Sequence, residues 1–303
     1  MEEVNTGNNN FNPFLKRKRK TSTANRAFDF VKILVIFCFI VFTLLPIISV
    51  ITTSISPGGE SSTFFPTKID WFAIKHVLTD TAFYTSFGVT ILVVVLGSFI
   101  SVLCMSMLGY ALSKKNLPFR KTIFVFFLIA MLFSGGMVPN YIMMNTLKLT
   151  DTIFALVFPN VVNVMHVILI KNYFEDLPDS LEESAKMDGA GNFQIFFKVI
   201  LPMSLPMIVT ITLFTAVIYW NNYTNALLYI SSQASELYPL PYYIIQLNAK
   251  FADPNASQIM GESFFYMENI RAATIVLSML PITIAYPFFL KYFTKGVTVG
   301  SDK

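Results

Sequence analysis

The apolar positions of this chain gather into six long runs that are separated by shorter polar segments. A transmembrane helix needs about 20 consecutive, mostly apolar residues, and each run is close to that length or exceeds it. We therefore predict an all-α integral membrane protein with six transmembrane helices. The predicted spans are 31–55, 86–112, 122–144, 152–170, 203–223 and 272–290.

The composition supports the membrane assignment. Hydrophobic residues make up 54% of the 303 positions and charged residues only 13%, whereas soluble domains carry about 25% charged residues. This deficit argues against a single large soluble core. Both cysteines, Cys38 and Cys104, lie inside apolar runs, and the sequence has no Cys/His cluster with metal-ligand spacing. We therefore predict no metal site and no catalytic residue.

The distribution of Lys and Arg predicts the topology. With both termini inside, the six spans place 1–30, 113–121, 171–202 and the C-terminus in the cytoplasm, and these segments with Lys32 hold 17 of the 22 Lys and Arg residues. This is the bias of the positive-inside rule. The basic tail 1–30 precedes a membrane span, so we expect it to contact lipid headgroups and not nucleic acid. The run 31–55 is too long for the apolar part of a signal peptide, and we expect it to remain as the first span.

Small residues in the predicted second span indicate close helix packing. In a bilayer, helices associate where small side chains let their backbones approach, and this span carries Gly88, Gly97, Ser98, Ser101, Ser106 and Gly109. Outside the spans, 56–85 is predicted to be a polar loop with a short interfacial helix over 71–83. Residues 231–269 are predicted to be a second polar loop.

A patterned polar segment, 179–202, stands out between the fourth and fifth spans. Asp179 or Ser180 is placed to cap a short helix over 181–188, and the glycines at 189 and 191 predict a turn. A second helix over 192–200 is predicted to pack its Phe side chains under the bundle. The plain alternative is a connecting loop, but loops of that kind are shorter and less patterned. We therefore interpret the hairpin as a docking element for a cytoplasmic partner.

The hairpin resembles a family motif. Glu183-Ser184-Ala185, Gly189, Val199 and Leu201-Pro202 match the spacing of the EAA loop of ATP-binding-cassette importer permeases, with Ser184 and Val199 as the departures. The segments 109–114, 133–139, 149–152, 220–223 and 293–300 also resemble carbohydrate-importer permeases of the maltose-transporter second-subunit type, in the oligosaccharide branch of Gram-positive bacteria.

This resemblance implies a type-1 importer fold and a transport function. It implies a permease domain over 31–303 with a core bundle over about 83–291, in the bacterial cell membrane. The hairpin 179–202 would be the coupling helix that docks on an ATPase. The coupling residues carried over are Glu183, Ser184, Ala185, Asp188, Gly189, Ala190, Leu201 and Pro202.

The same resemblance implies partners. They are two nucleotide-binding ATPase subunits, a second homologous permease and an extracellular, lipid-anchored sugar-binding protein. ATP and Mg²⁺ would be bound by the ATPase, and this chain would hold no cofactor. The sequence agrees, because it lacks the G-x-x-x-x-G-K-[ST] phosphate loop. We predict a transport subunit that is not itself an enzyme.

Polar residues inside two predicted spans are candidates for a substrate path. Asn160, Asn163 and His166 follow one another at i, i+3 and i+6 in the fourth span, and the fifth ends in Trp220-Asn221-Asn222-Tyr223. Aromatic faces stack on sugar rings and amides bond hydroxyl groups, so a low-affinity sugar path is one interpretation. Hydrogen bonds between helices are the other.

Two other function classes fit the sequence less well. A standalone channel or secondary transporter favours buried charges within its spans, yet no predicted span has an interior Asp or Glu. A membrane-embedded enzyme needs paired carboxylates, a Ser/His set or metal ligands, and the spans have none of these.

Overall fold

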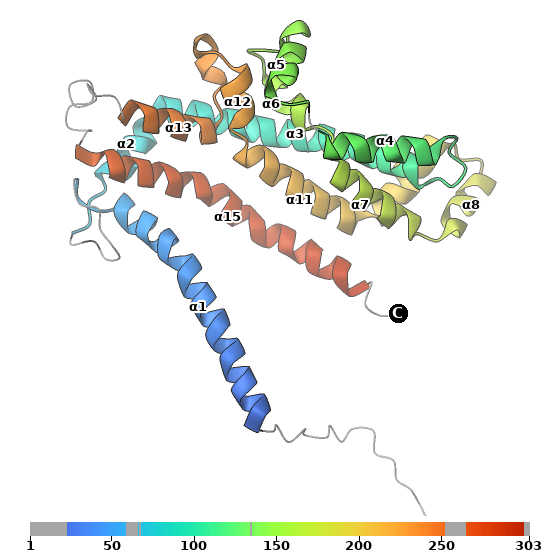
Figure 1. The fold of residues 1–303 in the computed structure, drawn as a ribbon, viewed down its shortest axis with the longest axis horizontal. Coiled ribbons are helices and arrows are strands. Elements are labelled where there is room, and N and C mark those ends of the chain that lie inside the picture. The colour runs from blue at the N-terminus through green and yellow to red at the C-terminus, as the bar shows by residue number, and fades with distance from the viewer. Residues whose placement is uncertain (1–22, 59–65, 67, 134, 252–264, 300–303) are drawn as a thin grey trace, which may run out of the picture. The chain divides into compact units, whose positions relative to one another are not determined.

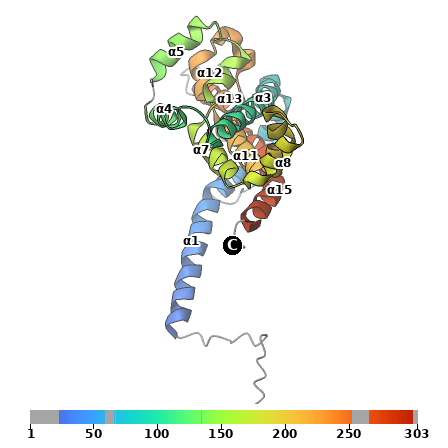
Figure 2. The same cartoon turned by 90° about the vertical axis from the view of Figure 1, so that its right-hand side faces the viewer.

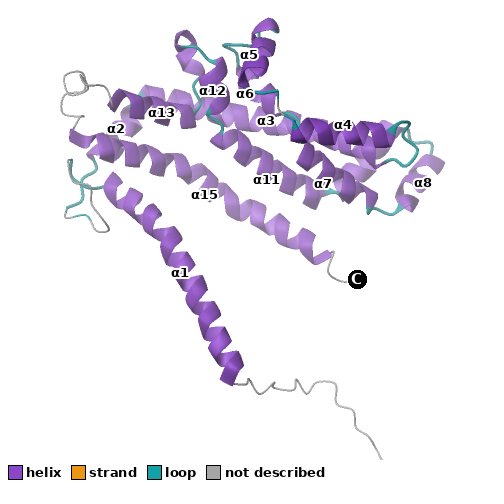
Figure 3. Cartoon of the chain, viewed as in Figure 1, coloured by secondary structure: helices purple, strands orange, loops and turns teal. Residues whose placement is uncertain are grey.

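A computed structural model describes residues 23–58, 66, 68–133, 135–251 and 265–299. Every regular element among these residues is a helix (Figure 3). The predicted tail 1–30 lies mostly outside the described residues, and so does 252–264 of the second predicted polar loop. The chain divides into two compact units, Met1–Ser49 and Val50–Lys303. The candidate site lies in the second unit.

The six predicted spans correspond to three long helices and three bent helix pairs. The long helices are α1 (Thr23–Ser54), α3 (Thr81–Ser113) and α15 (Met267–Val299). Among the described residues, each long helix contains a segment long and apolar enough to cross a membrane, which gives three. The number rises to as many as six if each bent pair is one span. An all-helical membrane fold is therefore confirmed.

The bent pairs differ from the continuous helices that the sequence predicts. The third span is α4 (Arg120–Leu132) followed by α5 (Met137–Thr146). The fourth is α6 (Ile153–Val157) with η1 (Phe158–Asn160), bent by 55° from α7 (Val164–Glu175). The fifth predicted span is α11 (Leu205–Asn221), which is bent by 83° from the preceding helical segment Asn192–Met203.

Helix α3 is the centre of the second unit. It packs against both α7 and α11, and the three lie together in the view of Figure 2. A Cβ atom built on Gly97 would lie 2.7 Å from the Tyr219 ring of α11, and one built on Gly109 would lie 2.7 Å from Ile170 of α7. Both contacts confirm the predicted close packing. Gly88 is different, because a Cβ there meets nothing within 4 Å among the described residues, so its predicted packing role is wrong for this part of the chain.

A buried tyrosine holds three helices together at the first of these contacts. The Tyr219 side chain is 1% exposed, and its hydroxyl donates to the Val157 carbonyl at 3.0 Å. Ser101 Oγ lies 2.8 Å from the same hydroxyl oxygen. Because the tyrosine proton is already used, the serine is the donor. The apolar core of a bilayer offers no water to bond, so polar groups of spanning helices must find such partners within the protein.

The loops between the spans contain more helix than predicted. Helix α2 (Phe72–Thr79) is shorter than the predicted 71–83, because Asp80 ends it and caps α3 by accepting from the Ala82 amide at 2.9 Å. Two short helices, α12 (Thr224–Tyr229) and η3 (Ser232–Leu237), follow α11.

Helix α13 (Leu240–Phe251) contradicts the predicted polar loop 231–269. The prolines near its start suggest a loop, but proline is compatible with the first turn of a helix. The buried residues Tyr243, Leu247 and Phe251 recur every fourth position, which is a helical stripe. The Tyr243 hydroxyl donates to Asp80 at 2.6 Å, and burial together with this bond raises the pKa of Tyr243.

We expect Gly97→Ala and Gly109→Ala to lower the melting temperature of the purified protein in detergent, while Gly88→Ala leaves it unchanged or raises it. Each of the three replacements improves helix propensity by about 1 kcal/mol, so this contribution to stability is the same in all three variants. Only at 97 and 109 does the new Cβ meet a neighbouring helix, and such overpacking costs about 1–3 kcal/mol. Equal melting temperatures for Gly97→Ala and Gly88→Ala would contradict the packing account.

Candidate functional site

The candidate site is a hairpin that lies at the far end of α3 from α2 and α13 (Figure 1). Its first arm is α8 (Asp179–Met187), and its second arm is α9 (Asn192–Ile195), a π-helical turn η2 (Phe196–Ile200) and α10 (Leu201–Met203). The two arms and the turn occur where the sequence predicts them. The predicted cap is wrong, however. Pro178 is the capping residue, and no side chain caps the helix. Asp179 and Glu182 instead lie in the first turn, where a carboxylate favours the helix dipole.

Gly189 makes the turn between the arms possible. Its φ of +79° lies in the left-handed region, and its amide donates to the Lys186 carbonyl at 3.0 Å while Ala190 donates to Ala185 at 3.0 Å. A Cβ at Gly189 would meet nothing within 4 Å. The glycine is therefore required by backbone conformation and not by lack of space.

The second arm anchors the hairpin in the apolar core. Ile195, Phe196 and Ile200 are at most 2% exposed and pack in one cluster with residues of α3 and α7. The Phe196 ring lies 5.2 Å from the Tyr110 ring of α3. Phe193 does not share this role, because it is 70% exposed. The prediction that the Phe side chains of this arm pack under the bundle is therefore wrong for Phe193 and also for Phe197, which is 43% exposed.

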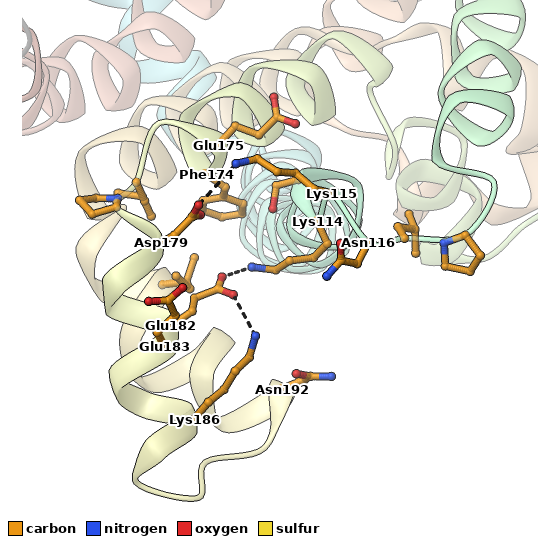
Figure 4. A pocket seen from close by; sticks show the side chains of 16 residues that line it. Lys114, Lys115, Asn116, Phe174, Glu175, Asp179, Glu182, Glu183, Lys186 and Asn192 are labelled. Atoms are coloured by element: carbon orange, nitrogen blue, oxygen red, sulfur yellow. Dashed lines mark hydrogen bonds and ion pairs between the residues drawn. The ribbon is translucent and has the colours of Figure 1, made fainter.

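Ion pairs anchor the first arm to the end of α3. Glu182 pairs with Lys114 and, at 3.9 Å, with Lys186, while Asp179 lies 3.4 Å from Lys115 (Figure 4). These groups line a cavity of about 470 Å³ between the hairpin and the end of α3. Burial, and secondarily the charge of Lys186, lower the pKa of Lys114 to about 8, against the opposing effect of Asp179. Lys114 is therefore still mostly charged at neutral pH.

The outer face of the hairpin is open. Glu183, Ser184 and Asp188 are exposed, and Met187 is 88% exposed. Within the described part of the chain the Glu183 side chain has no ion-pair or hydrogen-bond partner. Both neighbouring glutamates line the cavity, but Glu182 is held by two lysines, whereas Glu183 is exposed and has no ion-pair partner among the described residues.

The eight predicted coupling residues divide between this face and its support. Glu183, Ser184, Asp188 and Gly189 are on the exposed face, whereas Ala185, Ala190 and Leu201 are partly buried against the core cluster. Pro202 is exposed at the start of α10, one turn before the bend into α11. The hairpin therefore presents a small polar surface on a rigid support.

The candidate path residues of the fourth span do not share one helix. The bend falls between Asn160, at the end of η1, and Val164, at the start of α7. Asn163 caps α7 by accepting from the His166 amide at 3.2 Å. The buried His166 ring lies 3.5 Å from Thr215 Oγ1 of α11. The Nδ2 of Asn160 is buried and has no hydrogen-bond partner among the described residues.

The path residues of the fifth span are also engaged within the protein. Trp220 is buried, with its ring edge-on to Phe87 at 6.4 Å. Asn221 donates to the Val217 carbonyl at 2.9 Å, and Asn222 accepts from the Asn225 amide at 3.1 Å. Tyr223 is 43% exposed. These contacts favour the second interpretation, in which most of the candidate residues form hydrogen bonds that hold helices and turns together.

Sequence reasoning missed two residues that shape this part of the molecule. Tyr219 directly precedes the Trp220 segment and is 1% exposed, and its hydroxyl bonds to α6 and α3. Asp151 has a φ of 58°, accepts from the Ser231 amide and donates its own amide to the Tyr229 carbonyl at 3.0 Å. Asp151 lies in the segment 149–152, where an acidic residue in a short polar turn is the signal that could have identified it.

Comparisons with known proteins give a consistent picture. Residues 107–299 match the family described as binding-protein-dependent transport system inner membrane component. The chain is 36% identical over 285 residues to the polygalacturonan/rhamnogalacturonan transport system permease protein YtcP of Bacillus subtilis, covering 92% of this chain and 99% of that protein.

Two solved structures are similar. The first is a crystal structure of a bacterial ABC transporter involved in the import of the acidic polysaccharide alginate. It matches with a TM-score of 0.83 and 33% identity over 90% of this chain and 98% of the other. The second is a bacterial alginate ABC transporter in complex with an alginate pentasaccharide-bound periplasmic protein. At 14% identity and a TM-score of 0.53, over 88% of this chain and 93% of the other, it shows likeness of fold alone.

We expect Glu182→Gln to accelerate amide hydrogen exchange throughout α8 several-fold, because it removes the carboxylate that holds two lysines. The Glu182 side chain is only 16% exposed, so this pair is less screened than a surface pair. Glu183→Gln is the matched control and should leave the exchange unchanged. The exchanged pair Lys114→Glu with Glu182→Lys should restore slow exchange in part, because the pair with position 114 is regained while Lys186 is repelled. If both single glutamate variants exchange alike, Glu182 does not anchor the arm.

Proposed function

The chain belongs to the family of binding-protein-dependent transport system inner membrane components, and on that premise we propose how it works and what it carries. It is the permease subunit of an ATP-driven importer for an oligosaccharide or other carbohydrate. The hairpin 179–202 couples closure of an ATPase to alternating access through the bundle. The observation that carries this proposal is the open polar face beside Glu183 on an arm that is otherwise anchored.

The hairpin is mechanically suited to coupling. A force on its outer face passes through Glu182 and Lys114 to the end of α3, and through Phe196 and Ile200 to the core cluster shared with α7 and α11. Packed side chains in close contact transmit displacement with little loss. The hairpin and the helices of the bundle should therefore move together.

The partners follow from this role. The chain needs two nucleotide-binding ATPase subunits, which bind ATP and Mg²⁺, a second homologous permease and an extracellular, lipid-anchored sugar-binding protein. The outer face carries carboxylates, so we expect the ATPase cleft that receives it to carry basic side chains. We place the protein in the bacterial cell membrane with both termini and the hairpin in the cytoplasm, as the positive-inside rule favours.

Carbohydrate as the substrate is supported by the names of the relatives. YtcP is named for polygalacturonan and rhamnogalacturonan transport, and the 33% identical structure belongs to an alginate importer. The path candidates in this chain are uncharged amides and aromatic rings, which suit sugar hydroxyl groups and ring faces. Among them Asn160 has a free amide donor, and we assign it to the path.

We expect Glu183→Lys and Gly189→Val to abolish uptake while the protein remains in the membrane. The first places a cation against the basic cleft, and the second forces a β-branched side chain into a left-handed backbone conformation. Asp176→Lys, an exposed charge reversal just before the hairpin, and Gly191→Ala, at a φ of −76° with open space, are the matched controls.

The measurement is uptake of labelled oligosaccharide by cells that carry the complete transport system, with the membrane content of each variant determined by immunoblot. Normal uptake by both Glu183→Lys and Gly189→Val would reject the coupling role. Uptake that continues without any ATPase would favour a standalone channel or secondary transporter.

The path assignment has its own test. We expect Asn160→Leu to reduce uptake without lowering thermal stability, because the amide it removes has no partner. Asn163→Ala should instead lower stability by about 1 kcal/mol, because it removes a helix cap. Melting temperature and uptake are measured on the same preparations. Full transport by Asn160→Leu would remove this residue from the path.

A further inference from the structure

A small cavity outside the hairpin is lined by positive charge. It has a volume of about 130 Å³ and is lined by Leu112, Arg120, Lys121, Phe124 and Lys171. All three charged residues in this lining are cations. They come from the first turn of α4 and the last two turns of α7, while Leu112 comes from the last turn of α3.

The charge in the cavity is only partly neutralised. Glu175 pairs with Arg120 and, at 2.7 Å, with Lys171, but this carboxylate does not line the cavity. Lys121 is exposed and has no ion pair among the residues that the structure describes. Three cations therefore face one carboxylate, and an anion in the cavity would balance the remainder.

Two of the cations are held in fixed positions. Arg120 Nε donates to the Leu112 carbonyl at 2.8 Å, which bonds the start of α4 to the end of α3. Lys171 Nζ lies 5.4 Å from the centre of the Phe124 ring, and its side chain is only 14% exposed. These contacts preorganise the donors, so little side-chain entropy is lost when an anion binds.

The surroundings indicate which anion fits. The helices α3, α4 and α7 all belong to candidate membrane spans, and the cavity lies where α3 and α7 end and α4 begins. The ends of spanning helices lie at the level of the lipid headgroups, so this is where we expect the cavity to be. Beyond it α4 presents Val125 and Phe126, which are 51% and 72% exposed. A ligand that fits both features has a phosphate at the cavity and acyl chains along α4.

We propose that this cavity, formed by Arg120, Lys121, Lys171 and Phe124, binds the phosphate headgroup of an anionic phospholipid. The lipid phosphate takes the place of the missing counter-charge, and its acyl chains cover the apolar side chains of α4. The site differs from a general basic membrane surface because its cations converge on one cavity. Lys115, on the same connection between α3 and α4, does not line it.

The test uses the full-length protein in detergent, titrated with phosphatidylglycerol and followed by native mass spectrometry. We expect Lys121→Gln and Lys171→Gln each to weaken phosphatidylglycerol binding about fivefold, the effect of one cation near a phosphate surface. Lys115→Gln removes the same charge from the same membrane face and should bind as the wild type does. Lys121 is exposed, so its variant tests the site without disturbing the fold.

Three results would overturn the proposal. One is equal weakening by Lys115→Gln, which would indicate only general surface charge. Another is wild-type binding by both Lys121→Gln and Lys171→Gln. The third is displacement of the lipid by millimolar inorganic phosphate, which would assign the cavity to a soluble anion. Phosphatidylcholine should not compete, because its headgroup carries no net charge, and competition by it would reject the anionic assignment.

Discussion

The close approach of two helices to the backbone of α3 is the constraint on which the second unit depends. At Gly97 and Gly109, α11 and α7 occupy the space that a Cβ atom would need. Hydrophobic burial cannot drive such packing inside a bilayer, because lipid is as apolar as the side chains. Van der Waals contact between closely packed helices and hydrogen bonds between them supply the energy instead. Tyr219 contributes to both, because its ring fills the space at Gly97 and its hydroxyl bonds to Ser101 and Val157.

The same helix connects this packing to the hairpin. Lys114 follows the last residue of α3 and pairs with Glu182 of α8. The second arm of the hairpin belongs to the same core cluster as Ile170 of α7, the residue that lies against Gly109. Displacement of α8 therefore reaches α3 by an ion pair and α7 by packed side chains. Within α8 two adjacent carboxylates differ, because both Glu182 and Glu183 line the cavity but only Glu182 forms ion pairs among the described residues.

The sequence predicted some features well for physical reasons. Run length and charge bias reflect the bilayer itself, so the spans could be located without knowledge of their contacts. The hairpin was predictable because Gly189 meets a local backbone requirement. Helix α13 was missed because prolines near its start resemble loop signals, although its stability comes from burial of Tyr243, Leu247 and Phe251 against distant residues. The role of Glu182 was missed because its partner, Lys114, is far away in sequence.

The bends explain why polar residues inside the spans were difficult to interpret. A break in a transmembrane helix frees backbone amides that must be bonded within the protein. Asn163 supplies an acceptor for the His166 amide at the 55° bend, and its own amide lies 3.4 Å from the sulfur of Met105. Polar side chains at regular spacing therefore mark a break here and not one continuous polar face. Asn160 differs because its buried Nδ2 serves no such bond. A buried donor without a partner is costly, whereas Asn163 and His166 are bonded within the protein.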